Sequence, residues 1–239
     1  MTSGKEWRQI GVARRDPAVS FLLLLPLALL HLSGRDKVDA GAFAIIERIL
    51  IQLGSWSGWL LTIVLAVGVF WATRRIQARR IPWRGGALLL ALEGMGWGLA
   101  LGPVLRVLTA AVSTQLQPLS LGFAEVHGWL ALSAGAGLYE ELLFRAGLMS
   151  ALYVLIGSFL SAFFSKEAVS GFSFGSALLL SSVIFSWAHA LGDPSALEAG
   201  PFLFRALAGV VLGLMFSFRG LAVVAYAHAT YDAHFLLST

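Results

Sequence analysis

Long apolar runs, separated by short polar or basic segments, make up most of the chain. Six of these runs are long enough for a single membrane span, at 17–33, 54–72, 85–112, 172–191, 202–218 and 221–237. A further run, 128–164, is too long for one ordinary span, because about 20 helical residues cross the ~30 Å hydrocarbon core of a bilayer. That run predicts two spans meeting near residues 145–147, or one long tilted helix with a break. The pattern as a whole predicts an all-α, polytopic transmembrane helix bundle of seven or eight spans.

Two segments fall outside this pattern. Residues 35–52 mix polar and apolar positions, and 43–50 has the amphipathic spacing of a helix that lies at the membrane interface. Residues 113–126 are polar enough to form a loop on the far side of the membrane. No polar segment is long enough for a second domain, so we expect a single integral membrane domain over residues 1–239.

Composition and charge agree with a membrane protein. The chain is 58% hydrophobic and 13% charged with a mean hydropathy of +0.80, whereas soluble domains carry about 25% charged residues. The net charge of +4 does not indicate nucleic-acid binding, since the basic residues cluster between spans. The densest cluster is Arg74, Arg75, Arg79, Arg80 and Arg84. The positive-inside rule places this loop and the N-terminus on the cytoplasmic side, in what we expect to be a bacterial cytoplasmic membrane.

Small residues and one acid mark the predicted span at 85–112. Gly94, Gly98 and Gly102 stand four apart and form a ridge for close helix packing, and Gly209 and Gly213 form a second such step. Glu93 lies beside the first ridge. Its carboxyl is either an interhelical hydrogen-bond partner or part of a functional site, because acids within spans are costly to keep.

The strongest concentration of charge inside an apolar run is Glu140-Glu141-x-x-x-Arg145. Glu141 and Arg145 are four apart with the acid first, which favours an ion pair on one helix face. Glu140 points about a third of a turn away and has no basic residue at the same spacing. A carboxyl held in an apolar surround can act as a general base or acid. The alternative is that all three side chains form one network of charges with a purely structural role.

Histidines in later runs add to this picture. His189 ends one predicted span, and His228 stands four residues before Asp232 in the last one. A carboxylate one turn away can fix the tautomer and orientation of an imidazole. Glu140, His189 and His228 could therefore converge and activate a water. The remaining histidines, His31, His127 and His234, lie near span ends and are expected at the interface.

Other chemistries can be ranked on the same residues. The chain has no cysteine, which excludes disulfides, thiol nucleophiles and Cys-based zinc sites. HExxH is absent, and the GxSxG match at 171–175 begins a span rather than a strand-to-helix elbow. A zinc ion held by His189, His228 and a carboxylate stays open on residue types alone.

Three motifs stand in order: Glu140-Glu141-x-x-x-Arg145, Phe185-x-x-x-His189 and His228-x-x-x-Asp232. This arrangement resembles the CAAX protease and bacteriocin-processing family, whose best-known branch removes the last three residues of prenylated CAAX proteins. The resemblance covers about 130–234, within a motif-bearing core at about 128–237. It implies a glutamate-type intramembrane protease that needs no metal ion or cofactor.

The resemblance also implies roles for single residues. Glu140 and His189 would activate the water, and His228 with Asp232 would hold the oxyanion of the tetrahedral intermediate. Glu141, Arg145 and Phe185 would support them. The prenyl-protease branch has asparagine where this chain has Asp232. Since an ionised carboxylate cannot stabilise an oxyanion, Asp232 is either protonated or orients His228 instead.

We therefore expect an intramembrane endopeptidase that cuts a membrane-anchored or lipid-associated protein, with membrane lipid as its surroundings and no nucleic acid as partner. Prenylated CAAX proteins, leader peptides and sorting tails all remain open as substrates. One alternative is a non-catalytic immunity or scaffold protein of the same family that binds a peptide partner. A proton-coupled transporter is the third hypothesis, which is disfavoured because the chain has no internal repeat.

Overall fold

The computed structural model describes residues 11, 13–34, 52, 54, 56–81, 83–109, 126–191 and 194–237. Within these ranges all regular structure is helical. The amphipathic segment at 43–50 lies outside the described residues, and so does the predicted loop at 113–126 except for Val126, which begins α6. The elements are α2 (Pro17–Gly34), α4 (Trp56–Arg79), α5 (Arg84–Thr109), α6 (Val126–Gly135), η3 (Ala136–Met149), α7 (Ser150–Leu160), α8 (Lys166–His189), η4 (Pro194–Leu197), α9 (Ala199–Arg219) and α10 (Leu221–Leu237).

Five helices are long and apolar enough to cross a membrane: Pro17–Gly34, Gly86–Thr109, Val126–Leu160, Lys166–His189 and Ala199–Arg219. The chain is thus an all-helical integral membrane protein. The predicted spans at 54–72 and 221–237 fall on α4 and α10, which are not among these five. The expected count of seven or eight spans is therefore not confirmed.

Residues 126–160 form one continuous helix of 35 residues, built from α6, η3 and α7. Of the two arrangements predicted for this run, the structure shows the single long helix. Its middle part, η3, is a π-helix of 14 residues, in which backbone hydrogen bonds connect residues five rather than four apart. π-Helical turns are rare and are often found at functional sites. The predicted break is therefore a change of helix type in the stretch that carries both glutamates.

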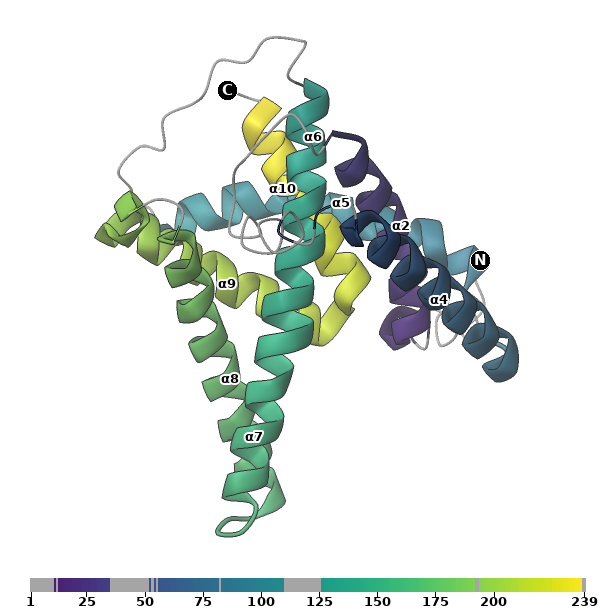
Figure 1. Ribbon diagram of the computed structural model, residues 1–239. Coiled ribbons are helices and arrows are strands. Elements are labelled where there is room, and N and C mark those ends of the chain that lie inside the picture. Colours follow the sequence, from purple (N-terminus) through teal and green to yellow (C-terminus); the bar gives the residue numbers. More distant parts are fainter. Residues whose placement is uncertain are drawn as a thin grey trace, which may run out of the picture.

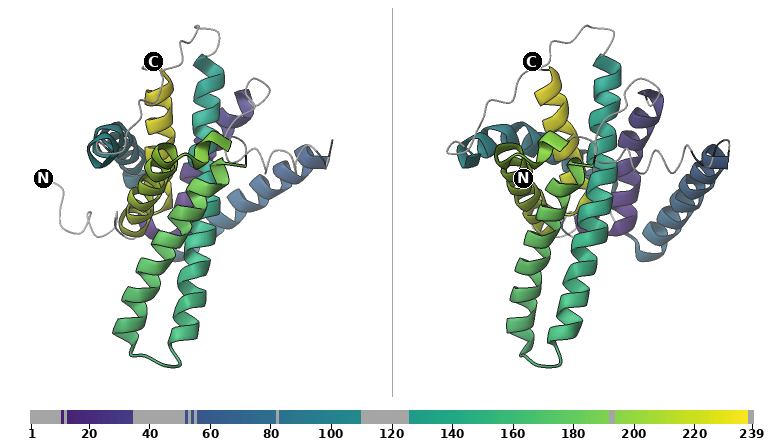
Figure 2. Two further views of the ribbon diagram at one scale, coloured as in Figure 1. Left: turned by 90° about the vertical axis from the view of Figure 1, so that its left-hand side faces the viewer. Right: turned by 60° about the vertical axis from the view of Figure 1, so that its left-hand side comes forward.

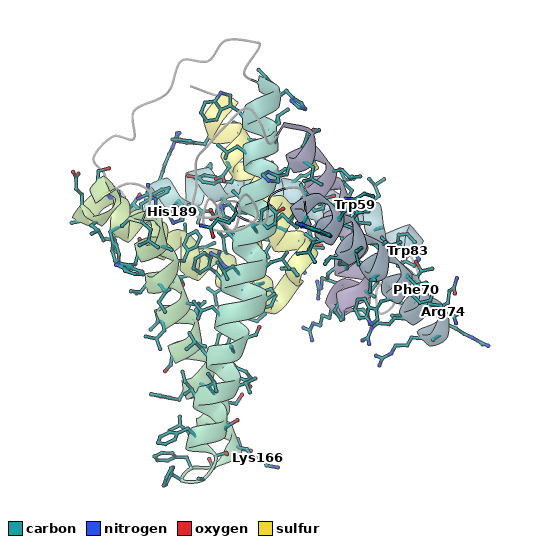
Figure 3. The ribbon with its side chains drawn as sticks, viewed as in Figure 1. Trp59, Phe70, Arg74, Trp83, Lys166 and His189 are labelled. Atoms are coloured by element: carbon teal, nitrogen blue, oxygen red, sulfur yellow. The ribbon has the colours of Figure 1, made fainter. Side chains whose placement is uncertain are left out.

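Helix α10 lies at the centre of the bundle, between η3 and α5 (Figure 1). Its first half consists of small and β-branched residues that are almost wholly buried, such as Val223, Val224, Ala225 and Ala227. Helices α7 and α8 run side by side as a long hairpin that extends from one end of the bundle (Figure 2). Helix α4 packs against α2 on the outside of the bundle. Its Trp59 and Phe70 point outward and are 69% and 66% exposed (Figure 3).

The glycine ridge of α5 brings α10 close, as its spacing predicted. A Cβ atom added at Gly94 would lie 2.6 Å from the Val223 carbonyl oxygen, and one at Gly98 would collide with the Ala227 carbonyl oxygen. Gly209 and Gly213 of α9 face Ser182 and Leu178 of α8 in the same way. Both small-residue steps are therefore helix contacts. The first fixes α10, which carries His228, against α5, and the second fixes α9 against α8.

Glu93 forms an ion pair with Arg219, the last residue of α9. This contact joins α5 to α9 and decides between the two sequence interpretations of Glu93. The carboxyl is an interhelical partner and does not line the cavity beside Glu140 that is described below.

The start of α2 is fixed by Asp16, which precedes Pro17 at the first helical position. The Asp16 carboxylate accepts a hydrogen bond of 2.9 Å from the Ala18 backbone N–H, as an N-cap does. It also accepts bonds from Arg75 of α4, whose Nε lies 3.2 Å from each carboxylate oxygen. Burial raises the pKa of Asp16, but the hydrogen bonds from Arg75 and Ala18 and the charges of Arg75 and Arg79 outweigh it, so the pKa lies below its ordinary value of 3.8.

Two substitutions at Asp16 separate these contributions. Asp16→Asn keeps a capping oxygen but removes the charge, and we expect it to lower the free energy of unfolding by about 1 kcal/mol at pH 7. Asp16→Ala also removes the cap and should lose about 1 kcal/mol more. Because the folded-state pKa is lowered, the charge contributes fully above the ordinary value of 3.8 and is lost as the pH falls through the folded value. Thermal unfolding in detergent against pH measures this. If the wild type stayed more stable than Asp16→Asn at pH values below the folded-state pKa of Asp16, the assigned role of the charge would be wrong.

Candidate active site

The three charged side chains of η3 are buried inside the bundle. Glu140 is 3% exposed, Glu141 0% and Arg145 2%. The predicted pair forms, with Arg145 Nη1 lying 2.9 Å from Glu141 Oε1. The Arg145 guanidinium also lies over the ring of Phe185 of α8, 4.3 Å from its centroid, in a cation–π contact. Arg145 therefore balances the charge of Glu141 and connects η3 to α8.

His228 of α10 makes its short hydrogen bond to Glu141. Its Nδ1 donates to Glu141 Oε1 over 2.7 Å, whereas its Nε2 lies 3.5 Å from Asp232 Oδ2. From the spacing of four along one helix, Asp232 was predicted either to orient His228 or, when protonated, to help hold the oxyanion. In the structure Glu141 holds the far side of the ring, so Nε2 is turned toward Glu140 and Asp232.

His189, at the end of α8, is held by its own helix. Its Nδ1 donates a hydrogen bond of 2.9 Å to the Phe185 carbonyl oxygen, and the two rings contact edge to face at 4.8 Å. In a neutral imidazole whose Nδ1 carries the hydrogen, Nε2 is an acceptor. The motif spacing of Phe185 and His189 thus has a local cause, since one turn of helix separates the ring from the carbonyl that orients it.

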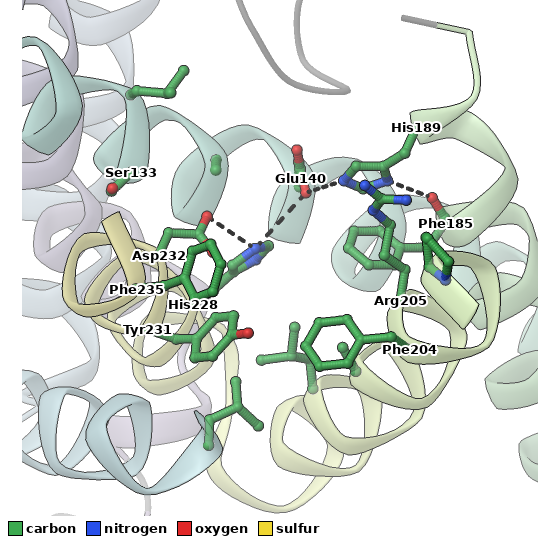
Figure 4. A pocket seen from close by; sticks show the side chains of 16 residues that line it. Ser133, Glu140, Phe185, His189, Phe204, Arg205, His228, Tyr231, Asp232 and Phe235 are labelled. Atoms are coloured by element: carbon green, nitrogen blue, oxygen red, sulfur yellow. Dashed lines mark hydrogen bonds and ion pairs between the residues drawn. The ribbon is translucent and has the colours of Figure 1, made fainter. Parts of the chain in front are cut away.

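Glu140 joins the two histidines. Its Oε2 lies 3.8 Å from His189 Nε2 and 3.8 Å from His228 Nε2. Both distances are too long for a direct hydrogen bond and suit groups connected through one water molecule. Figure 4 shows the carboxylate and the two imidazoles turned toward one another from η3, α8 and α10. The structure therefore brings together the three side chains that the sequence placed in separate apolar runs.

These groups line a cavity of about 260 Å³. Glu140, Phe185, His189, His228 and Asp232 reach its surface, whereas Glu141 and Arg145 lie behind them. The walls are otherwise mainly apolar, which is typical of sites that bind an organic substrate with a few placed polar groups. Among the described residues, no group of three or more His, Cys, Asp or Glu side chains is arranged to hold a metal ion.

Three polar residues of the cavity were not predicted: Ser133 of α6, Arg205 of α9 and Tyr231 of α10. Arg205 lies beside the ring of His189 in Figure 4, and the two interact electrostatically. The sequence did contain an indication of Arg205, because it is the single charged residue inside the apolar run 202–218, and charges within membrane spans often have a function. Ser133 and Tyr231 had no comparable signal, since hydroxyl side chains are common in membrane helices.

His31, which was predicted near the membrane interface, is buried between helices. It is 4% exposed, and its Nδ1 donates a hydrogen bond of 3.0 Å to the Ala131 carbonyl oxygen of α6. The ring also contacts Tyr139 edge to face at 5.3 Å. A position near a span end did not reveal this, because α2 packs along α6 and covers the ring. His127 lies within hydrogen-bond distance of Ser33, and His234 is exposed.

Gly137, one turn before Glu140, permits the close approach of η3 and α10. A Cβ atom at this position would lie 2.5 Å from the Ala225 carbonyl oxygen and 2.7 Å from Ala229 Cβ. Backbone atoms of α10 cannot move aside without moving His228, which follows Ala227. The glycine therefore sets the separation of the two helices that carry Glu140, Glu141 and His228.

Gly137→Ala should lower the free energy of unfolding by about 1 to 3 kcal/mol, the usual cost of overpacking a core, and should reduce any activity of the site. The matched control is Gly96→Ala in α5, where an added Cβ meets nothing within 4 Å. We expect that control to keep the wild-type melting temperature or to raise it slightly, since alanine favours helix more than glycine does. Equal melting temperatures for the two variants would show that Gly137 does not set the helix separation.

Comparison with known proteins agrees with this arrangement. A protein-family model, Type II CAAX prenyl endopeptidase Rce1-like, matches residues 122–234. This segment belongs to the CAAX protease family. The match begins just before α6 and includes every charged and histidine residue of the site. It confirms the resemblance drawn from the three motifs and indicates an intramembrane protease that acts on membrane-associated proteins. No curated protein and no solved structure matches the chain significantly.

Proposed function

We propose that this protein is a glutamate-type intramembrane endopeptidase that hydrolyses a peptide bond of a membrane-associated protein. The observation that carries the proposal is the position of Glu140 Oε2, 3.8 Å from Nε2 of both His189 and His228. The three groups face one cavity of about 260 Å³ inside an apolar bundle. A carboxylate and an imidazole that are one water molecule apart form a general-base pair.

In the proposed reaction a water molecule lies between Glu140 and His189. Glu140 takes a proton from it while the oxygen attacks the peptide carbonyl, so that a C–O bond forms and the carbonyl becomes an oxyanion. His189 orients the water, because its Nδ1–H is used by the Phe185 carbonyl and its Nε2 accepts a hydrogen bond. As the tetrahedral intermediate collapses, the C–N bond breaks and the leaving amine takes the proton from Glu140.

The oxyanion needs donors or positive charge near the attacked carbonyl. His228 Nε2 faces the cavity and is one candidate donor. Asp232 lies 3.5 Å from the same nitrogen, so its carboxylate can accept the Nε2 proton but adds negative charge. We assign the compensating positive charge to Arg205, which lines the same cavity beside His189 (Figure 4). In this proposal three positive charges balance three carboxylates. The cations are Arg145, Arg205 and a protonated His228, and the carboxylates are Glu140, Glu141 and Asp232.

Glu141, Arg145 and Phe185 act as positioning residues in this proposal. Glu141 holds His228 through a 2.7 Å hydrogen bond and pairs with Arg145 at 2.9 Å. Arg145 lies on Phe185, whose carbonyl in turn orients His189. One chain of contacts therefore connects both histidines behind the cavity, and it is shielded from solvent.

The substrate we expect is anchored to the membrane by a lipid or a helix, since the site lies within the bundle. Purified protein in liposomes is incubated with a farnesylated peptide ending in a CAAX sequence, and separately with peptides anchored by one transmembrane helix. Mass spectrometry of the products identifies the bond that is cut. Hydrolysis of an internal peptide bond supports the proposal. Retention of every peptide intact, with each shown to bind, would favour a binding protein. We place the N-terminus on the cytoplasmic side of a bacterial membrane, from the arginine-rich loop.

A further inference from the structure

A second cavity, of about 540 Å³, lies farther along the same long helix as the catalytic cavity. Residues 132–140 line the catalytic cavity, whereas Leu142, Ala146 and Ser150 line the second one. Its other walls come from the start of α2, from α4 and from the corner between α9 and α10. No residue lines both cavities. The second cavity is therefore a separate feature that the proposed hydrolysis does not use.

The lining changes in character along α2. Arg14 and Arg15 precede the helix, Ser20 follows in its first turn, and Phe21 and Leu24 come next. From Arg14 to Leu24 the chain advances by about 15 Å at the helical rise. The cavity is therefore cationic where α2 begins and apolar deeper along it, where Trp71 and Phe216 also contribute.

The positive charge at this end is only partly balanced by nearby acids, because the carboxylate of Glu93 attracts Arg14 as well as its own partner Arg219. Asp16 is engaged by Arg75, and Glu93 is paired with Arg219. The Nε of Arg14 is buried and has no hydrogen-bond partner within the described part of the chain. Burial and the neighbouring Arg219 lower the pKa of Arg14 from its ordinary value. An anion bound in the cavity beside Arg14 would relieve the repulsion between the guanidinium groups of Arg14 and Arg219.

A cationic mouth and an apolar interior together fit one class of membrane component. We propose that this cavity binds an anionic phospholipid, with its phosphate on Arg14 and Arg15 and an acyl chain along Phe21, Leu24 and Trp71. Guanidinium groups bind phosphate through paired hydrogen bonds. Basic pockets between helices on the cytoplasmic side are typical sites for acidic headgroups, and the arginine-rich loop places α2 with its first residues on that side.

Native mass spectrometry of the full chain in detergent tests this site with phosphatidylglycerol and with phosphatidylcholine of the same acyl chains. We expect wild-type protein to retain phosphatidylglycerol at least about tenfold more tightly than phosphatidylcholine. Arg14→Gln/Arg15→Gln should lose that preference. The matched control, Arg74→Gln/Arg80→Gln, removes the same charge from exposed arginines that do not line the cavity, and it should bind phosphatidylglycerol as the wild type does.

A second variant keeps the test decisive if the double variant does not fold. Ala146→Trp fills the apolar part of the cavity and leaves both arginines in place, and it should weaken phosphatidylglycerol binding about tenfold. Equal affinity of the wild type for the two lipids would overturn the proposal. So would unchanged lipid binding by both cavity variants, or displacement of the lipid by millimolar inorganic phosphate, which would indicate a site for soluble anions. None of these readouts depends on peptide hydrolysis.

Discussion

Glu140→Gln should lower the rate of peptide hydrolysis by about 10²- to 10⁴-fold, the usual contribution of a general base. The substitution keeps the size of the side chain but removes its ability to take a proton from water. Glu140 Oε2 lies 3.8 Å from both histidine Nε2 atoms, so this carboxylate can share one water molecule with either ring. Asp232, the other acid that lines the cavity, lies 3.5 Å from His228 Nε2 and interacts with His189 through its charge. The measurement is kcat on the membrane-anchored peptide that wild-type protein cleaves in liposomes.

The matched control for this variant is Glu167→Gln, at the exposed start of α8. It removes the same charge far from the cavity and should keep wild-type activity. Thermal unfolding of both variants shows whether the fold is retained, since Glu140 is 3% exposed and its loss could loosen the bundle. A folded Glu140→Gln protein with full activity would refute the proposed function.

Arg205→Gln should lower kcat by about 10²- to 10³-fold with little change in KM, as loss of an oxyanion-stabilising group does. The expected effect is on kcat because the negative charge on the substrate oxygen develops only in the transition state. If Arg205 instead bound a carboxylate of the substrate, its substitution by glutamine would raise KM. Arg205→Lys keeps the charge and should recover part of the loss. Arg106→Gln, at the exposed end of α5 and outside the cavity, is the matched control.

The proposed compensation of the Asp232 charge by Arg205 allows a sharper test of the same assignment. If Arg205 offsets the charge of Asp232, then Asp232→Asn introduced into the Arg205→Gln protein should raise kcat by about tenfold, which is ~1.4 kcal/mol of transition-state stabilisation. A double variant slower than Arg205→Gln alone would show that Asp232 works by orienting His228. Unchanged kcat in Arg205→Gln, with Glu140→Gln inactive, would reject the role of Arg205 and leave the proposed hydrolysis intact.

A buried network of charges in an apolar bundle needs such close compensation. Unpaired ionised groups at membrane depth are costly. Here Glu141 is shared between Arg145 at 2.9 Å and His228 at 2.7 Å, so the groups behind the cavity are fixed by one another. Glu140, in contrast, lines the cavity. The network therefore leaves exposed to the cavity the carboxylate that we propose as the general base.

Features that repeat along one helix could be predicted from the sequence. Apolar runs predicted a helical membrane protein, and a spacing of four predicted the Glu141–Arg145 pair and the glycine faces of α5 and α9, all of which the structure confirms. These predictions succeed because the helix backbone fixes which residues face the same way. The three motifs also led to the family whose match covers residues 122–234.

Which helices meet became clear only from the three-dimensional structure. It turned Glu141 toward His228, brought Arg205 of α9 into the cavity and buried His31 against α6. It also showed residues 126–160 as one helix with a π-helical centre. No spacing along the chain encodes these facts, because contacts between helices depend on packing over the whole bundle. At Gly137 that packing allows α10 to approach so closely that an added Cβ would lie 2.5 Å from the Ala225 carbonyl oxygen.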